Sequence, residues 1–164
     1  MVTELDVAIA APSGLAKLPL DALHRGLGAR MAPFAGYEMP LQYEAGIVAE
    51  TLHTRRQASL FDVSHMGQAI LAGGGVARAL ESLAPADLIS LSPERTRYTQ
   101  LLNESGGILD DLLITRLPGV EERMLLVVNA SRKREDFALI AAALPRFDFN
   151  PLDRALLALQ GPRA

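Results

Sequence analysis

Three apolar runs in the second half of the chain are separated only by short turns that contain glycine. Residues 97–103 and 112–117 flank a Glu-Ser-Gly-Gly turn at 104–107, and residues 123–129 follow a Pro-Gly turn at 118–119. Glycine adopts positive φ at little cost, so such turns reverse the chain directly into a neighbouring strand. The sequence therefore predicts that these runs are adjacent antiparallel strands.

The other segments alternate between helical and extended patterns. Apolar residues recur at helical spacing in four predicted helices, which cover residues 20–27, 46–57, 76–82 and 132–144. Ser131 is the candidate N-cap of the last one. Extended runs are expected at 59–72, with an interruption at 64–67, and at 156–160, whereas 30–43 is expected to pack as irregular loop or short strands. The predicted fold class is α+β, with a mixed, mostly antiparallel sheet and helices.

Composition narrows the range of functions. The chain carries 16 Lys and Arg against 19 Asp and Glu, without a long basic block, so we expect no nucleic-acid partner. The absence of cysteine excludes disulfides, iron–sulfur sites and thiolate zinc sites within this chain. No apolar run approaches the roughly 18 residues of a membrane span, and the N-terminus resembles neither a signal nor a transit peptide. We therefore expect a cytoplasmic protein without a membrane partner.

The two ends of the chain differ from its middle. Residues 1–19 offer little to bury and are expected to form a disordered leader, which leaves 20–164 as the folded region. The apolar strand at 156–160 lies close to Ala164, so little chain remains to cover it. We expect this strand to expose apolar surface and the chain to be part of something longer.

Two adjacent carboxylates, Asp110 and Asp111, begin the apolar run after the Gly-Gly turn. Successive strand side chains point to opposite faces, so one carboxylate should face a core or cleft and the other water. Desolvation by neighbouring Leu and Ile would raise a carboxyl pKa and suit it to proton transfer. The simpler alternative is a pair of Asp residues that cap the turn. No further acidic cluster supplies the ligands of Mg²⁺ or Ca²⁺, so no metal site is expected.

Other polar residues lie near predicted strand ends. Asp62, Ser64 and His65 are close in sequence, but a hydrolase triad joins distant positions and usually carries a GxSxG elbow, which is absent. Tyr98 and Asn129 suit a flat, hydrogen-bonding ligand, although Asn129 is more simply a residue at a helix start.

Together, these stretches resemble the aminomethyltransferase, or T protein, family of the glycine cleavage system. FDVSHMG at 61–67 and NESGGILDD at 103–111 are the most specific pieces. The full matching segments, in family order, are LHRGLGARMAPFAGYEMPLQY at 23–43, IVAETLHTRRQASLFDVSHMGQ at 47–68, RYTQLLNESGGILDDLLITR at 97–116, LLVVNASRKREDF at 125–137 and LALQGP at 157–162. Family members are much longer, so residues 20–164 resemble the N-terminal portion of their folate-binding fold.

The resemblance implies a specific reaction. An aminomethyl carbon passes from the lipoylated H protein to tetrahydrofolate, ammonia is released, and methylenetetrahydrofolate forms. It also implies that Asp111 is the catalytic carboxylate and that Met66, Tyr98 and Asn129 bind folate. The implied partners are the lipoylated H protein and the C-terminal part of the T protein.

Three alternatives remain at this point. The folate domain of a dimethylglycine or sarcosine oxidase shares this fold, but no GxGxxG motif of a preceding flavin domain is present. A folate-binding iron–sulfur assembly protein lacks transferase activity, and the paired Asp residues favour the transferase over it. The third alternative is an inactive fragment.

Overall fold

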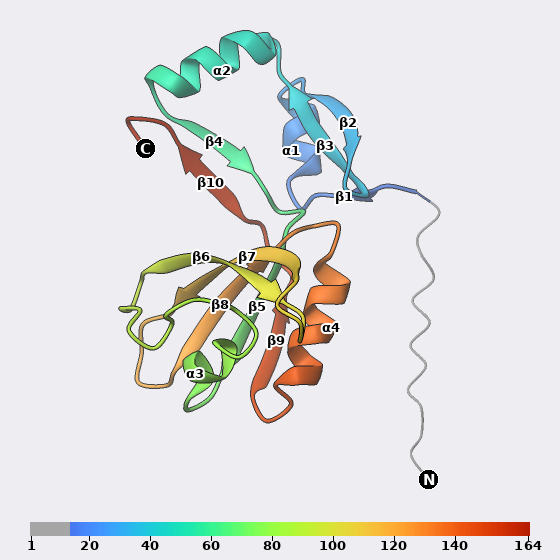
Figure 1. Ribbon diagram of the computed structural model, residues 1–164. Helices are drawn as coiled ribbons and strands as arrows, with labels where there is room; N and C mark the ends of the chain where they lie inside the picture. The colour runs from blue at the N-terminus through green and yellow to red at the C-terminus, as the bar shows by residue number, and fades with distance from the viewer. Residues whose placement is uncertain (1–13) are drawn as a thin grey trace.

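Strands and helices alternate along residues 14–164, the part of the chain that the computed structural model describes. In chain order the elements are β1 (Ala16–Lys17), α1 (Asp21–Gly26), β2 (Arg30–Phe34), β3 (Tyr37–Gln42), α2 (Gly46–Arg56), β4 (Ser59–Asp62), β5 (Gly67–Ala72), α3 (Val76–Leu80), β6 (Thr96–Leu102), β7 (Ile108–Arg116), β8 (Arg123–Val128), α4 (Lys133–Ala143), β9 (Asp148–Leu152) and β10 (Leu157–Gln160). They form two parts, joined where β4 leads into β5 and where β9 leads into β10 (Figure 1).

The larger part is a five-stranded sheet with strand order β6-β7-β8-β5-β9, and all its pairings are antiparallel. The short turns after β6 and β7 produce the hairpins that the sequence predicts, because neither turn leaves room for another element. The predicted α+β class with a mostly antiparallel sheet is confirmed. Only β1 and β3 pair in parallel among the described strands.

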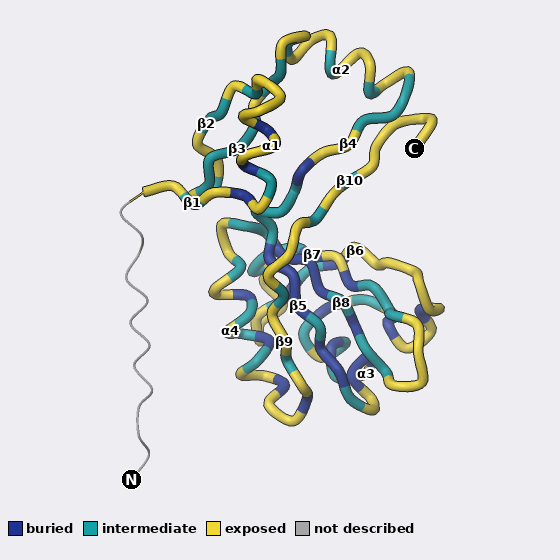
Figure 2. Tube along the Cα trace, turned by 180° about the vertical axis from the view of Figure 1, so that it is seen from behind, coloured by how far each residue is buried: buried dark blue, intermediate teal, exposed yellow. Residues whose placement is uncertain are grey.

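The hydrophobic core lies on one face of this sheet. Alternate residues of β7 and β8, such as Leu112, Ile114 and Leu126, are buried together with Leu80 of α3 and Ile140 of α4. The predicted apolar stripe of α4 therefore packs as expected. Figure 2 shows the buried residues gathered in the central strands and α3. On the opposite face the β6–β7 side is open, since Leu113 of β7 is 38% exposed, whereas Val127 of β8 is only 6% exposed.

The smaller part has little core of its own. It holds the sheet β1-β3-β2, helices α1 and α2, and the two-stranded ribbon of β4 and β10. Helix α2 has no buried residue, and Leu157 and Leu159 of β10 are about half exposed, as the sequence predicts. The strand does find a partner, because β10 pairs antiparallel with β4. No helix among residues 14–164 has the length and apolar character that crossing a membrane requires.

Three local expectations differ from the structure. The leader was expected to be disordered through residue 19, and residues 1–13 lie outside the described part, but Ala16 pairs with Tyr37 and Leu18 is buried. Ser131 does not cap α4, because the helix begins one residue later than expected and has Arg132 at its N-cap. Strand β9 was not predicted; it contains Pro151, which a sheet tolerates at its edge.

Candidate functional site

The turn between β6 and β7 sets the position of the two adjacent carboxylates. The Asn103 side-chain oxygen accepts hydrogen bonds from the backbone N–H groups of Gly107 at 2.8 Å and Ser105 at 3.1 Å. The register then shifts at Leu101 and Leu102, which leaves one extra residue in β7 before Asp110. Such a bulge changes the direction in which the following side chains point. Asp110 and Asp111 are therefore strand residues rather than caps of the turn.

Strand register brings three of the four predicted site residues to the same end of the sheet. Leu112 of β7 and Gly67 of β5 both pair with Val128 of β8. Asp111, Asn129 and Met66 each stand one residue beyond these pairs, on three neighbouring strands. Residues far apart in sequence thus become neighbours because β8 lies between β7 and β5.

Asp111 is held by two of these predicted residues. The hydroxyl of Tyr98, on β6, donates a hydrogen bond to Asp111 Oδ2 at 2.5 Å. The Asn129 amide Nδ2 donates to the other carboxylate oxygen, Asp111 Oδ1. Tyr98 is 59% exposed, so this cluster opens toward solvent on the face of the sheet away from the core.

The pKa of Asp111 shifts in the direction opposite to the expectation. Desolvation was expected to raise the pKa of the reactive carboxyl, but the hydrogen bonds from Tyr98 and Asn129 outweigh burial and lower the pKa of Asp111. The same contact with Asp111 raises the pKa of the Tyr98 phenol. Asp111 is therefore an anion at neutral pH, in reach of a ligand on the open face.

Asp110 points to the other face of the sheet, as strand alternation predicts, but it contacts the same amide. Asn129 Nδ2 lies 2.9 Å from Asp110 Oδ1. On its core side Asp110 lies close to Asp136 of α4, which is 1% exposed. Sequence reasoning missed Asp136, although it lies four residues before Ile140 and so on the apolar face of the helix.

Met66 is placed differently from the other three. It lines a hollow of about 540 Å³ together with Lys133 and Arg154, and Asp111, Tyr98 and Asn129 do not line it. Lys133 closes one side, because its ammonium donates to the Tyr37 hydroxyl at 2.5 Å and to a backbone oxygen at 2.9 Å. Met66 therefore lies between this hollow and the end of β8 that carries Asn129.

The polar residues around β4 form a buried link rather than a triad. His24, which sequence reasoning missed, contacts Asp62 Oδ2 at 2.8 Å through Nε2 and the Tyr43 hydroxyl at 2.7 Å through Nδ1. Asp62 also accepts from the Ser64 backbone N–H at 2.9 Å. Burial opposes ionisation of Asp62, but the hydrogen bonds from Ser64 and His24 hold its pKa below the usual range. Asp62 thus stands between the histidine and the serine, whereas a triad needs the histidine in the middle.

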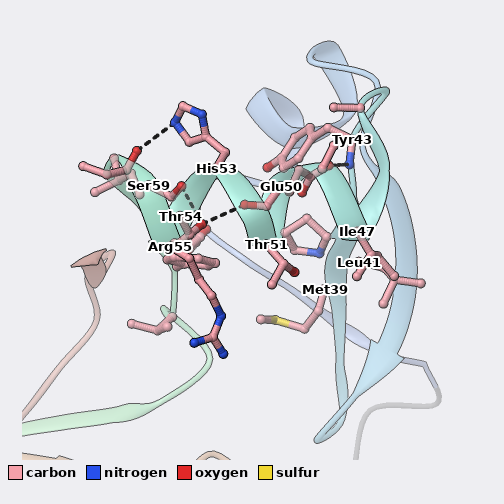
Figure 3. Close-up of a pocket in the computed structure, with 18 residues that line it drawn as sticks. Met39, Leu41, Tyr43, Ile47, Glu50, Thr51, His53, Thr54, Arg55 and Ser59 are labelled. Carbon is pink, nitrogen blue, oxygen red and sulfur yellow. Dashed lines mark hydrogen bonds between the residues drawn. The ribbon is translucent and has the colours of Figure 1, made fainter. Parts of the chain in front are cut away.

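A larger hollow, of about 1040 Å³, lies in the smaller part of the structure. Figure 3 shows Met39, Tyr43, Thr51 and Arg55 among the side chains around it. All its lining residues fall between 39 and 63, in and around β3, α2 and β4. The hollow is therefore separate from the carboxylate cluster, and the candidate site is the end of the five-stranded sheet.

Comparison with known proteins assigns the chain to a family. Residues 20–164 match the family described as GCVT N-terminal domain. The chain belongs to this family. Within the GCVT N-terminal family, it is 47% identical over 130 residues to the mitochondrial aminomethyltransferase of Gallus gallus, an alignment that covers 79% of this chain and 33% of that protein.

Two further relatives extend the match over more of the chain. The aminomethyltransferase of Thermosynechococcus vestitus is 41% identical over 160 residues, which cover 95% of this chain and 42% of that protein. The crystal structure of the glycine cleavage system aminomethyltransferase T from Bartonella henselae superposes with a TM-score of 0.85 at 43% identity, covering 92% of this chain and 42% of that one. The chain thus spans less than half the length of these relatives, and the resemblance to the N-terminal portion of a T protein is confirmed.

Proposed function

We propose that this chain supplies the catalytic carboxylate and part of the folate site of a glycine cleavage aminomethyltransferase. The single observation that carries the proposal is the cluster in which Tyr98 and Asn129 both donate hydrogen bonds to Asp111 on the open face of the sheet. An ionised carboxylate in reach of a ligand suits a reaction whose reacting carbon becomes positively charged.

The proposed reaction requires two bonds to break and two to form. The transferred carbon loses its bonds to the nitrogen that leaves as ammonia and to the lipoyl sulfur of the H protein. It gains bonds to two nitrogens of tetrahydrofolate, and methylenetetrahydrofolate results. The two protons that these nitrogens lose end on the released ammonia and the lipoyl thiol, so the atoms balance.

In this scheme Asp111 has two roles. Its negative charge stabilises the cationic carbon, and a remaining lone pair on one of its oxygens accepts the proton of the attacking nitrogen. Tyr98 and Asn129 keep Asp111 ionised and bind the flat pterin ring beside it, and Met66 supplies an apolar contact. No step needs a metal.

The relatives suggest the remaining partners. They are more than twice as long as the matched segment, and we propose that their additional residues cover the open face and complete the folate site. The lipoylated H protein is the proposed donor partner. The cytoplasmic location also stays a proposal, and the relatives from Gallus gallus and Dictyostelium discoideum are named mitochondrial enzymes.

The test replaces the carboxylate in a T protein of full family length whose N-terminal segment is this chain. Asp111→Asn keeps the side-chain shape and removes the charge, so formation of methylenetetrahydrofolate from the loaded H protein should fall by about 10²–10⁴-fold. Asp87→Asn is the matched control, because Asp87 lies in an exposed turn where its carboxylate accepts from the Ser90 backbone N–H. An Asp111→Asn enzyme with more than a tenth of normal activity would contradict the assignment.

A further inference from the structure

One acidic residue near the site has no role in the proposed reaction. Asp136 lies in the first turn of α4 and is 1% exposed. Arg132 is nearby, with Nε 3.8 Å from Asp136 Oδ1, which is too long for a direct hydrogen bond. A buried carboxylate in this position would carry a charge without adequate compensation.

Two buried oxygen atoms near this residue also lack donors. Asp110 Oδ2 and Asp136 Oδ2 are both shielded from solvent and have no donor among residues 14–164. The two carboxyl groups lie close to each other, so a proton on one of them would form a hydrogen bond to the other. Two carboxylates cannot form such a bond, whereas a protonated carboxyl is a donor and a carboxylate is an acceptor. One shared proton would therefore satisfy both oxygen atoms.

We propose that Asp136 is a positioning residue of the site: its neutral carboxyl donates a hydrogen bond to Asp110, and Asp110 holds the Asn129 amide against Asp111. Because Asp110 accepts the Asp136 proton at its other oxygen, Oδ1 is left to accept from Asn129. The two hydrogens of the Asn129 amide are then directed to Asp110 Oδ1 and Asp111 Oδ1.

This arrangement fixes the orientation of the amide. Since the nitrogen of Asn129 faces the two carboxyl groups, its carbonyl oxygen is directed elsewhere and accepts no hydrogen bond from the described part of the chain. It is thereby available to a ligand N–H donor. The value of this orientation for catalysis rests on the proposed function. The chain of hydrogen bonds from Asp136 through Asp110 to Asn129 does not.

The charged groups around Asp136 favour the neutral form. Burial is the largest influence, and Asp110 on β7 adds a hydrogen bond and a like charge; together they raise the pKa of Asp136 to about 7. Glu135 acts in the same direction, whereas Arg132 opposes it. Below neutral pH Asp136 is therefore protonated and donates to Asp110. Ionisation of Asp136 at higher pH removes this donor and places its negative charge beside that of Asp110.

The experiment is nuclear magnetic resonance of the 164-residue chain without any folate. We expect the Asp136 carboxyl carbon to titrate near pH 7, and the side-chain amide signals of Asn129 to shift with the same midpoint. In Asp136→Asn, where an amide N–H replaces the shared proton, the Asn129 shift with that midpoint should disappear. A purely structural role for Asp136 would produce neither effect.

Controls are available in the same spectra. The Gln68 side-chain amide is also buried but donates to the Arg154 backbone oxygen, so it should not follow the Asp136 titration. The proposal is wrong if Asp136 is already ionised at pH 6, or if the Asn129 signals titrate identically in Asp136→Asn. The wild-type titration decides the first point even if the variant fails to fold. Because no transfer is measured, failure of the proposed function would leave this result unaffected.

Discussion

Replacement of Asp136 by Asn should remove the loss of stability that ionisation of this carboxyl causes in the unaltered chain as the pH rises from 5 to 8. The folded state raises the pKa of this carboxyl from 3.8 to about 7, so over that interval the folded chain holds a proton that the unfolded chain has lost. Stability that depends on the proton is present in acid and is lost as pH rises through the folded-state pKa.

The size of the effect follows from the pKa interval. Each pKa unit corresponds to about 1.4 kcal/mol, so the full interval corresponds to roughly 4 kcal/mol and the part above pH 5 to roughly 3 kcal/mol. Arg132 becomes a better partner once Asp136 ionises, which reduces the loss. We therefore expect the free energy of unfolding of Asp136→Asn, relative to the unaltered chain, to gain about 2–3 kcal/mol between pH 5 and pH 8.

Urea unfolding followed by circular dichroism at the two pH values measures this difference. All other titratable groups are common to both proteins, so their contributions cancel in the comparison. Glu121→Gln is the control, because it removes an exposed carboxylate that does not act on Asp136 and should change stability by less than about 0.5 kcal/mol. The reasoning is refuted if the free energy of unfolding of Asp136→Asn, relative to the unaltered chain, falls between pH 5 and pH 8. Asp136 would then be an ionised partner of Arg132.

Two further substitutions test the surroundings of the site. Gly67→Ala would place a methyl group 2.7 Å from a Val128 methyl carbon. We therefore expect thermal melts to show a loss of about 1–3 kcal/mol in the free energy of unfolding. Gly74→Ala is the control, because its methyl group meets nothing within 4 Å and should change stability little. Equal melting temperatures for the two variants would contradict the close packing. Tyr98→Phe removes the strongest donor to Asp111 and should raise the pKa of that carboxyl in carbon-detected titrations; an unchanged pKa would show that Tyr98 does not bind it.

The antiparallel centre of the fold could be predicted from local sequence because its turns are short and contain glycine. Strands β6, β7 and β8 required no knowledge of distant contacts. Strand β9 and the pairing of β1 with β3 depend on partners far away in sequence, and the proline in β9 further obscured its pattern. The position of Leu18 in a buried environment likewise depends on elements that the local sequence does not specify.

The candidate site could be predicted only in part, for a related reason. Strand alternation correctly separated Asp110 from Asp111, since that property is local. The direction of the Asp111 pKa was wrong, because its two donors come from β6 and from the residue after β8. Asp136 was missed because the role of an acidic residue on an apolar helix face can be inferred only when its partner on the sheet, here Asp110, is known.

The two adjacent aspartates illustrate how one strand can hold carboxyl groups in opposite protonation environments. Asp111 faces the open side, where two donors favour its anion, while Asp110 faces the core, where a third carboxyl can approach only as a neutral acid. Asn129 contacts both carboxyl groups, so the charge state on the core side bears on the geometry on the open side. The bulge before Asp110 fixes this assignment, because a shift of one residue would exchange the faces of the two carboxyl groups. The turn at 103–107 therefore does more than connect two strands: it determines which aspartate a ligand meets.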